Sequence, residues 1–283
     1  MLLNAIDRLL KGSIDIHAHY GPDAAAKRKV DALAGAQQAV ATGMRAIVLK
    51  SHEYPTAPLA YTITQAVPEI SVFGSIALNS ETGGLDPVVV ETSAKLGAKV
   101  IWMPTLSSNY DYLHKKFKTG GIIILDEKGK LLPVVEKILG IVKQYDIVVA
   151  TGHLPVNECF VLVEKAREMG LRKIVATHPL GFELNTYYTI EQQCRIADMG
   201  AIVEYCFVTT LPEDGMPVQT MVEAIRTVGV GRCLLSSDLG QAHNPPPAEG
   251  MKMMIATMLS GGLSEKEIEI MVKINPARLL GLT

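Results

Sequence analysis

Four histidines and one aspartate of this sequence directly follow short apolar runs, at His17, His19, His153, His178 and Asp238. His17 and His19 are two residues apart, so in a strand both side chains lie on the same face. Neutral imidazole and carboxylate groups are ligands of Zn²⁺ and also suit Mn²⁺, Fe²⁺ and Ni²⁺. The five residues therefore predict a divalent metal site, with Zn²⁺ as the expected ion, provided that the fold brings them together.

Each of these residues alone has a simpler interpretation. A single histidine at the end of a strand is more often a hydrogen-bonding residue of the core, and one His-x-His pair is weak support for a metal. The combination is stronger, because every position falls at the end of a strand that hydrophobicity alone predicts.

The elements that position these residues are eight short apolar runs that alternate with helical patterns. We expect strands at 14–17, 46–49, 71–78, 100–103, 147–150, 174–177, 201–204 and 233–236. We expect helices near 31–42, 58–66, 86–97, 133–144, 155–169, 189–199, 218–228 and 248–260. Eight such units close a barrel more readily than they form an open sheet. The sequence therefore predicts an α/β fold, one (β/α)8 TIM barrel domain spanning residues 1–283.

In such a barrel the carboxyl ends of all strands surround one mouth, so the candidate ligands are expected to converge there. No Gly-x-Gly-x-x-Gly motif follows a strand, which removes the main support for a dinucleotide-binding fold.

Three segments extend the repeating pattern. Residues 105–132 form a long insertion after the fourth strand, with a predicted hairpin at 127–129. The apolar character of this insertion indicates either a cover over the barrel mouth or an oligomer contact. Residues 264–280 predict extra C-terminal helices, and residues 1–11 predict a short amphipathic helix at the bottom of the barrel.

The charge balance argues against nucleic acid as a partner. The 283 residues include 27 Lys and Arg and 29 Asp and Glu, a net charge of -2, whereas nucleic-acid-binding domains carry a clustered basic surface. The basic run at 27–29 is expected to be a solvated loop. No segment has the character of a membrane span or a secretory signal. We therefore expect a small-molecule substrate.

The sulfur-containing residues give weaker indications. The four cysteines have no metal-type spacing, which predicts reduced thiols in a cytoplasmic protein. Met254 and Met258 share one stripe of a predicted helix, which is typical of a core or a subunit contact. We expect a homo-oligomer.

The ligand candidates resemble the metal-ligand set of the amidohydrolase superfamily. The resemblance rests on Asp15-Ile16-His17-Ala18-His19, on His153, His178 and Asp238, and on the closing Asn275-Pro276-Ala277-Arg278-Leu279-Leu280-Gly281. The segments 50–52, 83–85, 102–105 and 244–247 are similar to an uncharacterised branch of that superfamily. The resemblance implies a metal-dependent barrel enzyme and leaves its substrate open.

One position departs from the superfamily pattern. Its binuclear members carry a carboxylated lysine or a glutamate on the fourth strand, whereas residues 102–104 read Trp-Met-Pro. Lys50, at the end of the second strand, is either a displaced carboxylated bridge, a contact to a substrate carboxylate or phosphate, or a surface lysine. Glu81 and Glu204 are further possible anionic ligands. The number of metal ions, one or two, stays open.

The resemblance implies hydrolysis of an amide, ester or lactone by a metal-activated water. Asp238 is expected to take the proton of that water and pass it to the leaving group. His178 is either a ligand or a residue that stabilises the oxyanion. His52, Glu81 and His243 are the candidates for substrate contacts.

Two other functions are compatible with the same residues. A metal-dependent non-oxidative decarboxylase or other lyase would use a similar ligand set and consume no water. A barrel that binds a metal or ligand without turnover would also keep the site, because one scaffold hosts many functions.

Overall fold

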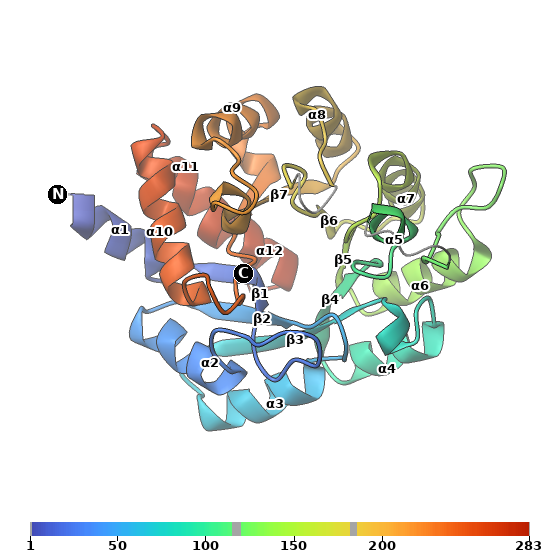
Figure 1. Ribbon diagram of the computed structural model, residues 1–283, viewed down its shortest axis with the longest axis horizontal. Coiled ribbons are helices and arrows are strands. Elements are labelled where there is room, and N and C mark those ends of the chain that lie inside the picture. Colours follow the sequence, from blue (N-terminus) through green and yellow to red (C-terminus); the bar gives the residue numbers. More distant parts are fainter. Residues whose placement is uncertain (1, 115–119, 182–185, 283) are drawn as a thin grey trace.

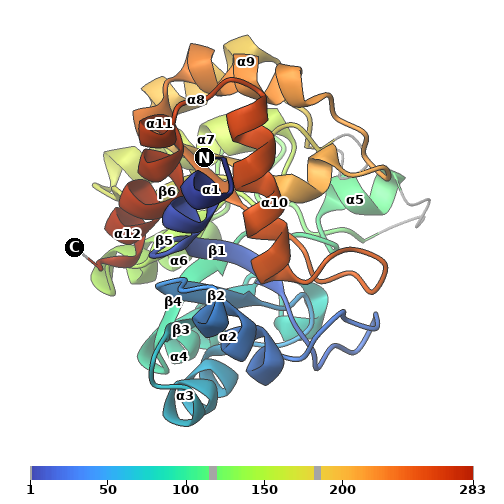
Figure 2. The same ribbon diagram turned by 90° about the vertical axis from the view of Figure 1, so that its left-hand side faces the viewer.

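The computed structural model describes residues 2–114, 120–181 and 186–282. Eight strands form the centre of the molecule and helices surround them (Figure 1, Figure 2). The strands are β1 Ile14–His19, β2 Ala46–Lys50, β3 Ser71–Ala77, β4 Ala98–Trp102, β5 Val148–Ala150, β6 Ile174–Ala176, β7 Ile202–Cys206 and β8 Cys233–Ser236. Each strand pairs in parallel with the next one along the chain. The predicted (β/α)8 TIM barrel is confirmed.

Hydrogen bonds just beyond β8 join the last strand to the first. The backbone N–H of Asp238 donates to the carbonyl of His17 at 2.7 Å, and the N–H of His19 donates to the carbonyl of Leu239 at 2.7 Å. The seam of the barrel therefore places three of the predicted ligands next to one another.

The helices follow the strands in the expected alternation. They are α1 Leu2–Leu10, α2 Ala32–Ala41, α3 Ala57–Ala66, α4 Pro87–Lys95, α5 Asn109–His114, α6 Pro133–Gln144, α7 Val156–Glu168, α8 Ile190–Asp198, α9 Val218–Val228, α10 Pro247–Ser260, α11 Glu265–Glu269 and α12 Asn275–Leu280. Short 3-10 turns lie at η1 Ser80–Thr82, η2 Phe207–Thr210 and η3 Val230–Arg232, and a π-helical turn at η4 Ile270–Ile274 joins α11 to α12. Asp31, Asp86, Thr189 and Ser264 cap helices by accepting first-turn N–H groups.

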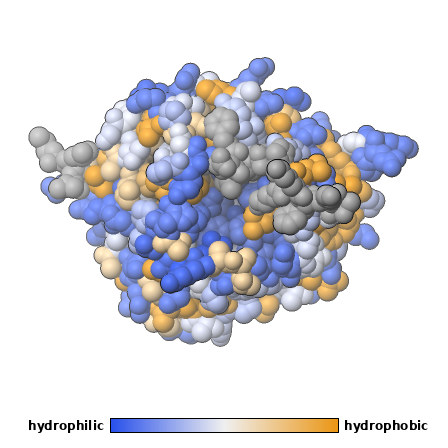
Figure 3. Space-filling model, viewed as in Figure 1, coloured by the Kyte–Doolittle hydropathy of each residue, from blue (hydrophilic) through white to orange (hydrophobic). Residues whose placement is uncertain are grey.

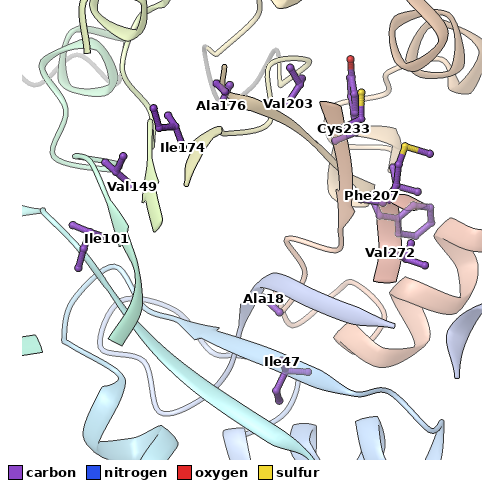
Figure 4. Close-up of a cluster of buried hydrophobic side chains, with 14 of the residues drawn as sticks. Ala18, Ile47, Ile101, Val149, Ile174, Ala176, Val203, Phe207, Cys233 and Val272 are labelled. Atoms are coloured by element: carbon purple, nitrogen blue, oxygen red, sulfur yellow. The ribbon is translucent and has the colours of Figure 1, made fainter. Parts of the chain in front are cut away.

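Two apolar cores lie on the two faces of the strands. Side chains such as Ile47 and Val149 point away from the barrel axis and pack under the helices, as Figure 4 shows. Alternate residues, among them Val48, Trp102 and Val148, fill the inside of the barrel. Burial on both faces explains why these strands read as nearly continuous apolar runs.

The bottom of the barrel is closed by the C-terminal helix α12. Its Ala277, Leu279 and Leu280 pack against the interior core. The prediction that the N-terminal helix covers the bottom is wrong, because α1 packs against α10 and α11 instead. An ion pair from Arg8 to Glu265 accompanies that packing.

The insertion after β4 lies at the end of the barrel opposite α12, as the position of α5 in Figure 2 shows. The N–H of Asp126 donates to the carbonyl of Lys130 at 2.8 Å, and that of Gly129 donates to Asp126 at 2.9 Å. These bonds confirm the predicted hairpin.

Two further expectations can be compared with the described residues. None of the described helices combines the length and the apolar character that crossing a membrane requires. Met254 and Met258 are fully buried within the main core. The methionine stripe is therefore part of the core of the protein.

Candidate metal centre

The first strand carries a β-bulge that directs its two histidines into the barrel. Its register against β2 shifts by one residue between Asp15 and Ala18, which is how a bulge resets the side-chain alternation. Ala18 packs in the outer core, as Figure 4 shows. His17 and His19 lie on the opposite face, where the His17 ring is 4.5 Å from the Trp102 ring.

The side chains of His17, His19 and Asp238 converge on one point. Asp238 Oδ1 lies 2.9 Å from His17 Nε2 and 3.1 Å from His19 Nε2. One ligand atom from each residue lies within 4.8 Å of the other two. His178 Nε2 is 4.0 Å from the second oxygen of Asp238. The structure thus brings together ligand candidates that are more than two hundred residues apart in the sequence.

A carboxylate behind His17 fixes the direction of its ring. Glu204 Oε2 lies 3.2 Å from His17 Nδ1, and Ser236 Oγ donates to Glu204 Oε1 at 2.8 Å. With the Nδ1 proton directed at Glu204, His17 presents its Nε2 lone pair to the Asp238 carboxylate. Two electron-rich atoms that face each other in a buried site require a cation beside them: a proton, a metal ion or the ammonium group of Lys50, whose Nζ lies 2.7 Å from His17 Nε2.

His153 and His178 are oriented in the same way. His153 Nδ1 lies 2.8 Å from Asp111 Oδ2. The hydroxyl of Thr186 donates to the carbonyl of His178, so it accepts from His178 Nδ1 at 2.9 Å. His178 Nε2 therefore carries a lone pair, and this buried atom has no hydrogen-bond partner among the described residues. A buried lone pair without a donor fits a metal ligand and does not fit a group that donates to an oxyanion.

His19 also has a buried nitrogen without a hydrogen-bond partner among the described residues, its Nδ1, while its Nε2 is the atom that faces Asp238. The donor set of imidazole nitrogens and a carboxylate oxygen is one that divalent transition metals prefer. The residues present therefore fit a metal ion.

Burial keeps most of these histidines in the form that binds metals. It lowers the pKa of His19 to about 3, and it is also the largest cause of the lowered pKa values of His153 and His178. Burial also opposes the charge of His17, but Asp238 and Glu204 outweigh it and raise the pKa of that residue. Although burial by itself raises the pKa of Asp238, His17 and His19 hold it well below the usual value. His19, His153 and His178 are therefore favoured in the neutral form and Asp238 in the ionised form, which are the forms that bind metals.

Lys50 lies beside this group and is only 2% exposed, so the structure excludes its interpretation as a surface lysine. Its Nζ is 2.7 Å from His17 Nε2 and 4.6 Å from the centre of the Trp102 ring. Burial lowers the pKa of Lys50, against the attraction of Asp238 and Glu204.

The backbone at the site adopts conformations that side chains disfavour. His178 has φ 26° and Asp238 has φ 50°, and both lie in the left-handed region. Gly240 has φ 144°, and a Cβ atom there would lie 2.1 Å from the carbonyl oxygen of His19. Such strain persists only where the surrounding structure imposes it, and it is concentrated at functional sites.

A pocket of about 230 Å³ opens at this end of the barrel. Figure 3 looks at this face and shows hydrophilic side chains around a central hollow. The pocket is lined by His19, Arg28, Lys50, His52, Leu106, His153, Val208, Glu213, Asp214, Asp238, Gln241, His243 and Asn244. It therefore joins the candidate ligands to the solvent.

The three candidates for substrate contacts lie in different surroundings. His52 lines the pocket and stacks on His19, with 4.8 Å between the ring centres. The side chain of His243 also lines it, is 60% exposed and pairs with Glu213 at 3.1 Å. Glu81 is exposed on η1, accepts from Ser107 Oγ at 3.3 Å and is not part of the lining. Glu204, the other possible anionic ligand, contacts Nδ1 of His17, whereas Asp238 contacts Nε2 of the same ring.

Sequence reasoning missed three polar residues around the site: Asp111, Thr186 and Arg28. Asp111 and Thr186 lie in connections whose path the local pattern does not predict. The side chain of Arg28 is 8% exposed and bound to Asp23, so the expectation of a solvated loop is wrong for this member of the basic run. The sequence did contain a signal for this ion pair, since an arginine follows the first strand within about ten residues and an aspartate lies five residues before it.

Comparisons with solved structures agree with this architecture. An amidohydrolase from Pseudomonas aeruginosa is 12% identical, with a TM-score of 0.67 over 99% of this chain and 98% of that chain. A 2,6-dihydroxybenzoate decarboxylase from Rhizobium is 11% identical, with a TM-score of 0.62 over 96% and 99%. A mutant organophosphorus hydrolase from Deinococcus radiodurans is 15% identical, with a TM-score of 0.61 over 95% and 93%. The predicted resemblance to the amidohydrolase superfamily is therefore confirmed at the level of the fold.

Sequence comparison is less specific. Residues 12–204 match the sequence model of DUF6282, a family of unknown function. No curated protein matches the chain.

Proposed function

The chain belongs to the family of unknown function DUF6282, and we propose that it is a metal-dependent hydrolase of small molecules. The proposed reaction is attack of an activated water on an amide, ester or lactone carbonyl, and Zn²⁺ is the proposed ion. The amidohydrolase and organophosphorus hydrolase with the same fold support a hydrolytic reaction.

The observation that carries this proposal is the convergence of His17, His19 and Asp238, with one atom of each within 4.8 Å of the others. His178 Nε2, buried and without a hydrogen-bond partner among the described residues, extends the group. These residues would hold the ion, and His153 would join them through the nitrogen opposite Asp111.

When bound, a divalent cation lowers the pKa of water to about 7 and polarises a carbonyl group. Asp238 Oδ1 is engaged by His17 and His19, whereas its Oδ2 lies 4.0 Å from His178. We assign to Asp238 the transfer of the water proton to the leaving group, a role that contributes about 10²- to 10⁴-fold to a rate. His178 would serve as a ligand through Nε2, the buried nitrogen that lies 4.0 Å from Asp238 Oδ2.

Lys50 contacts the same pocket and takes one of its two remaining roles. As an ammonium group it would contact the substrate, and as a carboxylated side chain it would supply an anionic ligand for a second ion. Elemental analysis of the purified protein distinguishes these roles, because one ion per chain supports the first and two support the second.

The experiment that tests the proposal compares metal content and ester hydrolysis in wild type, His17→Ala and Asp238→Asn. We expect wild type to bind metal and to hydrolyse 4-nitrophenyl butyrate or simple lactones. His17→Ala should lose the metal and the activity. Asp238→Asn should lose activity by about 10²-fold or more. Glu223→Gln, which changes an exposed carboxylate on α9, is the control. Full turnover in Asp238→Asn would exclude the proposed proton transfer.

A decarboxylase is the second candidate, because one neighbour of the same fold is named as a 2,6-dihydroxybenzoate decarboxylase. It would release carbon dioxide from an acid without consuming water. Measurement of carbon dioxide from the metal-loaded protein with 2,6-dihydroxybenzoate separates the two candidates.

A further inference from the structure

Arg28 belongs to the loop between β1 and α2, and this loop is attached to the segment that follows β8. The N–H of Lys29 donates to the carbonyl of Gly240 at 2.7 Å, and Arg28 forms a backbone bridge with Gln241. Gly240 follows the strand end that carries Asp238. Arg28 is therefore held at the barrel mouth, next to the candidate metal centre.

One edge of the Arg28 guanidinium is bound by a carboxylate. Asp23 Oδ2 accepts from Nε at 2.7 Å and lies 2.6 Å from Nη2. The other oxygen of Asp23 accepts from the backbone N–H groups of Ala25 at 3.0 Å and Ala26 at 2.8 Å. Asp23 thus fixes the orientation of the guanidinium, and its own acceptor capacity is largely used.

The second edge of the guanidinium is available. Nη1 of Arg28 has no hydrogen-bond partner among the described residues, although the side chain is only 8% exposed. Arg28 lines the pocket together with His19, Lys50 and His52. Burial is the main cause of the lowered pKa values of His19 and His52, and the positive charge of Arg28 adds to it, as expected for a cation near both rings.

The other charged groups of the described lining have partners. Lys50 contacts His17 at 2.7 Å, and Glu213 pairs with His243 at 3.1 Å. Arg28 therefore offers the pocket a pair of N–H donors that no carboxylate of the described chain accepts. Two parallel N–H groups of an arginine match the two oxygens of a carboxylate.

We propose that Arg28 binds a carboxylate group of the substrate, so that the protein acts on small carboxylic acids that also contain a hydrolysable carbonyl. The proposal rests on the proposed function for the identity of the reacting group. Arg28 is thus a specificity-determining residue of the pocket.

Binding of paired probes tests this proposal without turnover. Titration calorimetry of the Zn²⁺-loaded protein would compare 4-oxopentanoate, 5-oxohexanoate and 6-oxoheptanoate with the corresponding neutral amides. We expect the best acid to bind wild type about 10- to 100-fold more tightly than its amide, as a charge-assisted pair of hydrogen bonds implies. Arg28→Met should remove this preference. Lys27→Gln removes a charge from an exposed neighbour in the same loop and should keep it.

Arg28→Lys keeps a cation next to Asp23 and removes the second pair of parallel donors. It should also lose most of the preference, and it tests the proposal if Arg28→Met does not fold. An undiminished preference in a folded, metal-loaded Arg28 variant would overturn the proposal, as would a wild type that binds acid and amide equally. Absence of ester hydrolysis together with an Arg28-dependent preference would overturn the proposed reaction and leave the carboxylate site supported.

Discussion

Nδ1 of His153 lies 2.8 Å from Oδ2 of Asp111, and both side chains are buried. His153 follows β5 at the mouth of the barrel, whereas Asp111 belongs to α5 in the insertion after β4. A carboxylate at one ring nitrogen fixes the tautomer, directs the other nitrogen at the metal and raises its basicity. The insertion therefore contributes to the site, which supports its interpretation as a cover over the mouth.

This contact makes Asp111 a positioning residue for metal binding. We expect Asp111→Asn to weaken the affinity for Zn²⁺ by about 10- to 100-fold, because the His153 ring loses its charged acceptor. Competition with a chromophoric chelator measures this affinity without any assay of activity. Glu127→Gln removes an exposed carboxylate from the same insertion and should leave the affinity unchanged. Equal affinities of wild type and Asp111→Asn would show that His153 is not a ligand.

A second group with metal-ligand chemistry shares His17. Its members are His17, Glu204 and Cys206, and Cys206 Sγ lies 3.8 Å from His17 Nδ1. Burial raises the pKa of the Cys206 thiol well above its usual value, and Glu204 adds to the shift. A thiol that keeps its proton is a poor ligand, so we expect the metal on the Nε2 side of His17.

The Co²⁺-loaded protein distinguishes the two groups. We expect no sulfur-to-cobalt charge-transfer absorption in wild type, and an unchanged Co²⁺ affinity in Cys206→Ser. An intense near-ultraviolet band that disappears in Cys206→Ser would place the metal at Glu204 and Cys206 instead.

The barrel could be predicted because its strands are buried on both faces and its helices on one, which gives two distinct patterns of hydrophobicity. The candidate ligands could be predicted because strand ends of a barrel meet at one mouth. The shared face of His17 and His19 could be predicted from the alternation of a strand alone. The bulge in β1 shifts the register between Asp15 and Ala18 and leaves these two residues on one face.

The residues that were missed depend on contacts between distant segments. The position of Asp111 against His153 depends on the path of a long insertion, and that of Arg28 on the attachment of its loop to Gly240. Glu81 follows a strand like the other candidates, but η1 leaves it exposed. The N-terminal helix was expected to close the bottom, and only the packing of α12 against the interior core shows that the C-terminal helix does so.

Gly240 allows the close approach of the chain to the first strand. With φ 144° and a Cβ position 2.1 Å from the carbonyl oxygen of His19, it has no room for a side chain. We expect Gly240→Ala to lower the unfolding free energy by more than about 1 kcal/mol and to weaken Zn²⁺ binding, because His19 must move. Chemical unfolding and chelator competition measure the two effects.

Gly140 provides the matched substitution. It lies within α6, and a Cβ atom there would meet no other atom within 4 Å. Gly140→Ala should raise the unfolding free energy by about 0.5–1 kcal/mol without changing metal affinity. Similar behaviour of the two variants would contradict the steric role of Gly240.

Asp15 gives a pH dependence whose sign can be predicted. Burial raises its pKa from 3.8 to about 6, although the hydroxyl and N–H of Ser237 and the N–H of His17 donate to it. The folded protein therefore binds this proton more tightly than the unfolded chain, and the contribution of Asp15 to stability falls as pH rises from about 4 to about 6. A shift of this size corresponds to roughly 3 kcal/mol.

Asp15→Asn isolates this contribution from those of the neighbouring histidines, because both proteins contain them. In the metal-free state, the unfolding free energy of the variant minus that of wild type should increase by roughly 3 kcal/mol between about pH 4 and about pH 6. Above that range the difference should be constant, since the carboxyl is then ionised in both states of wild type. Urea unfolding at several pH values measures it. A difference that does not change with pH would mean that Asp15 is ionised in the folded protein throughout, held by the Ser237 hydroxyl at 2.5 Å.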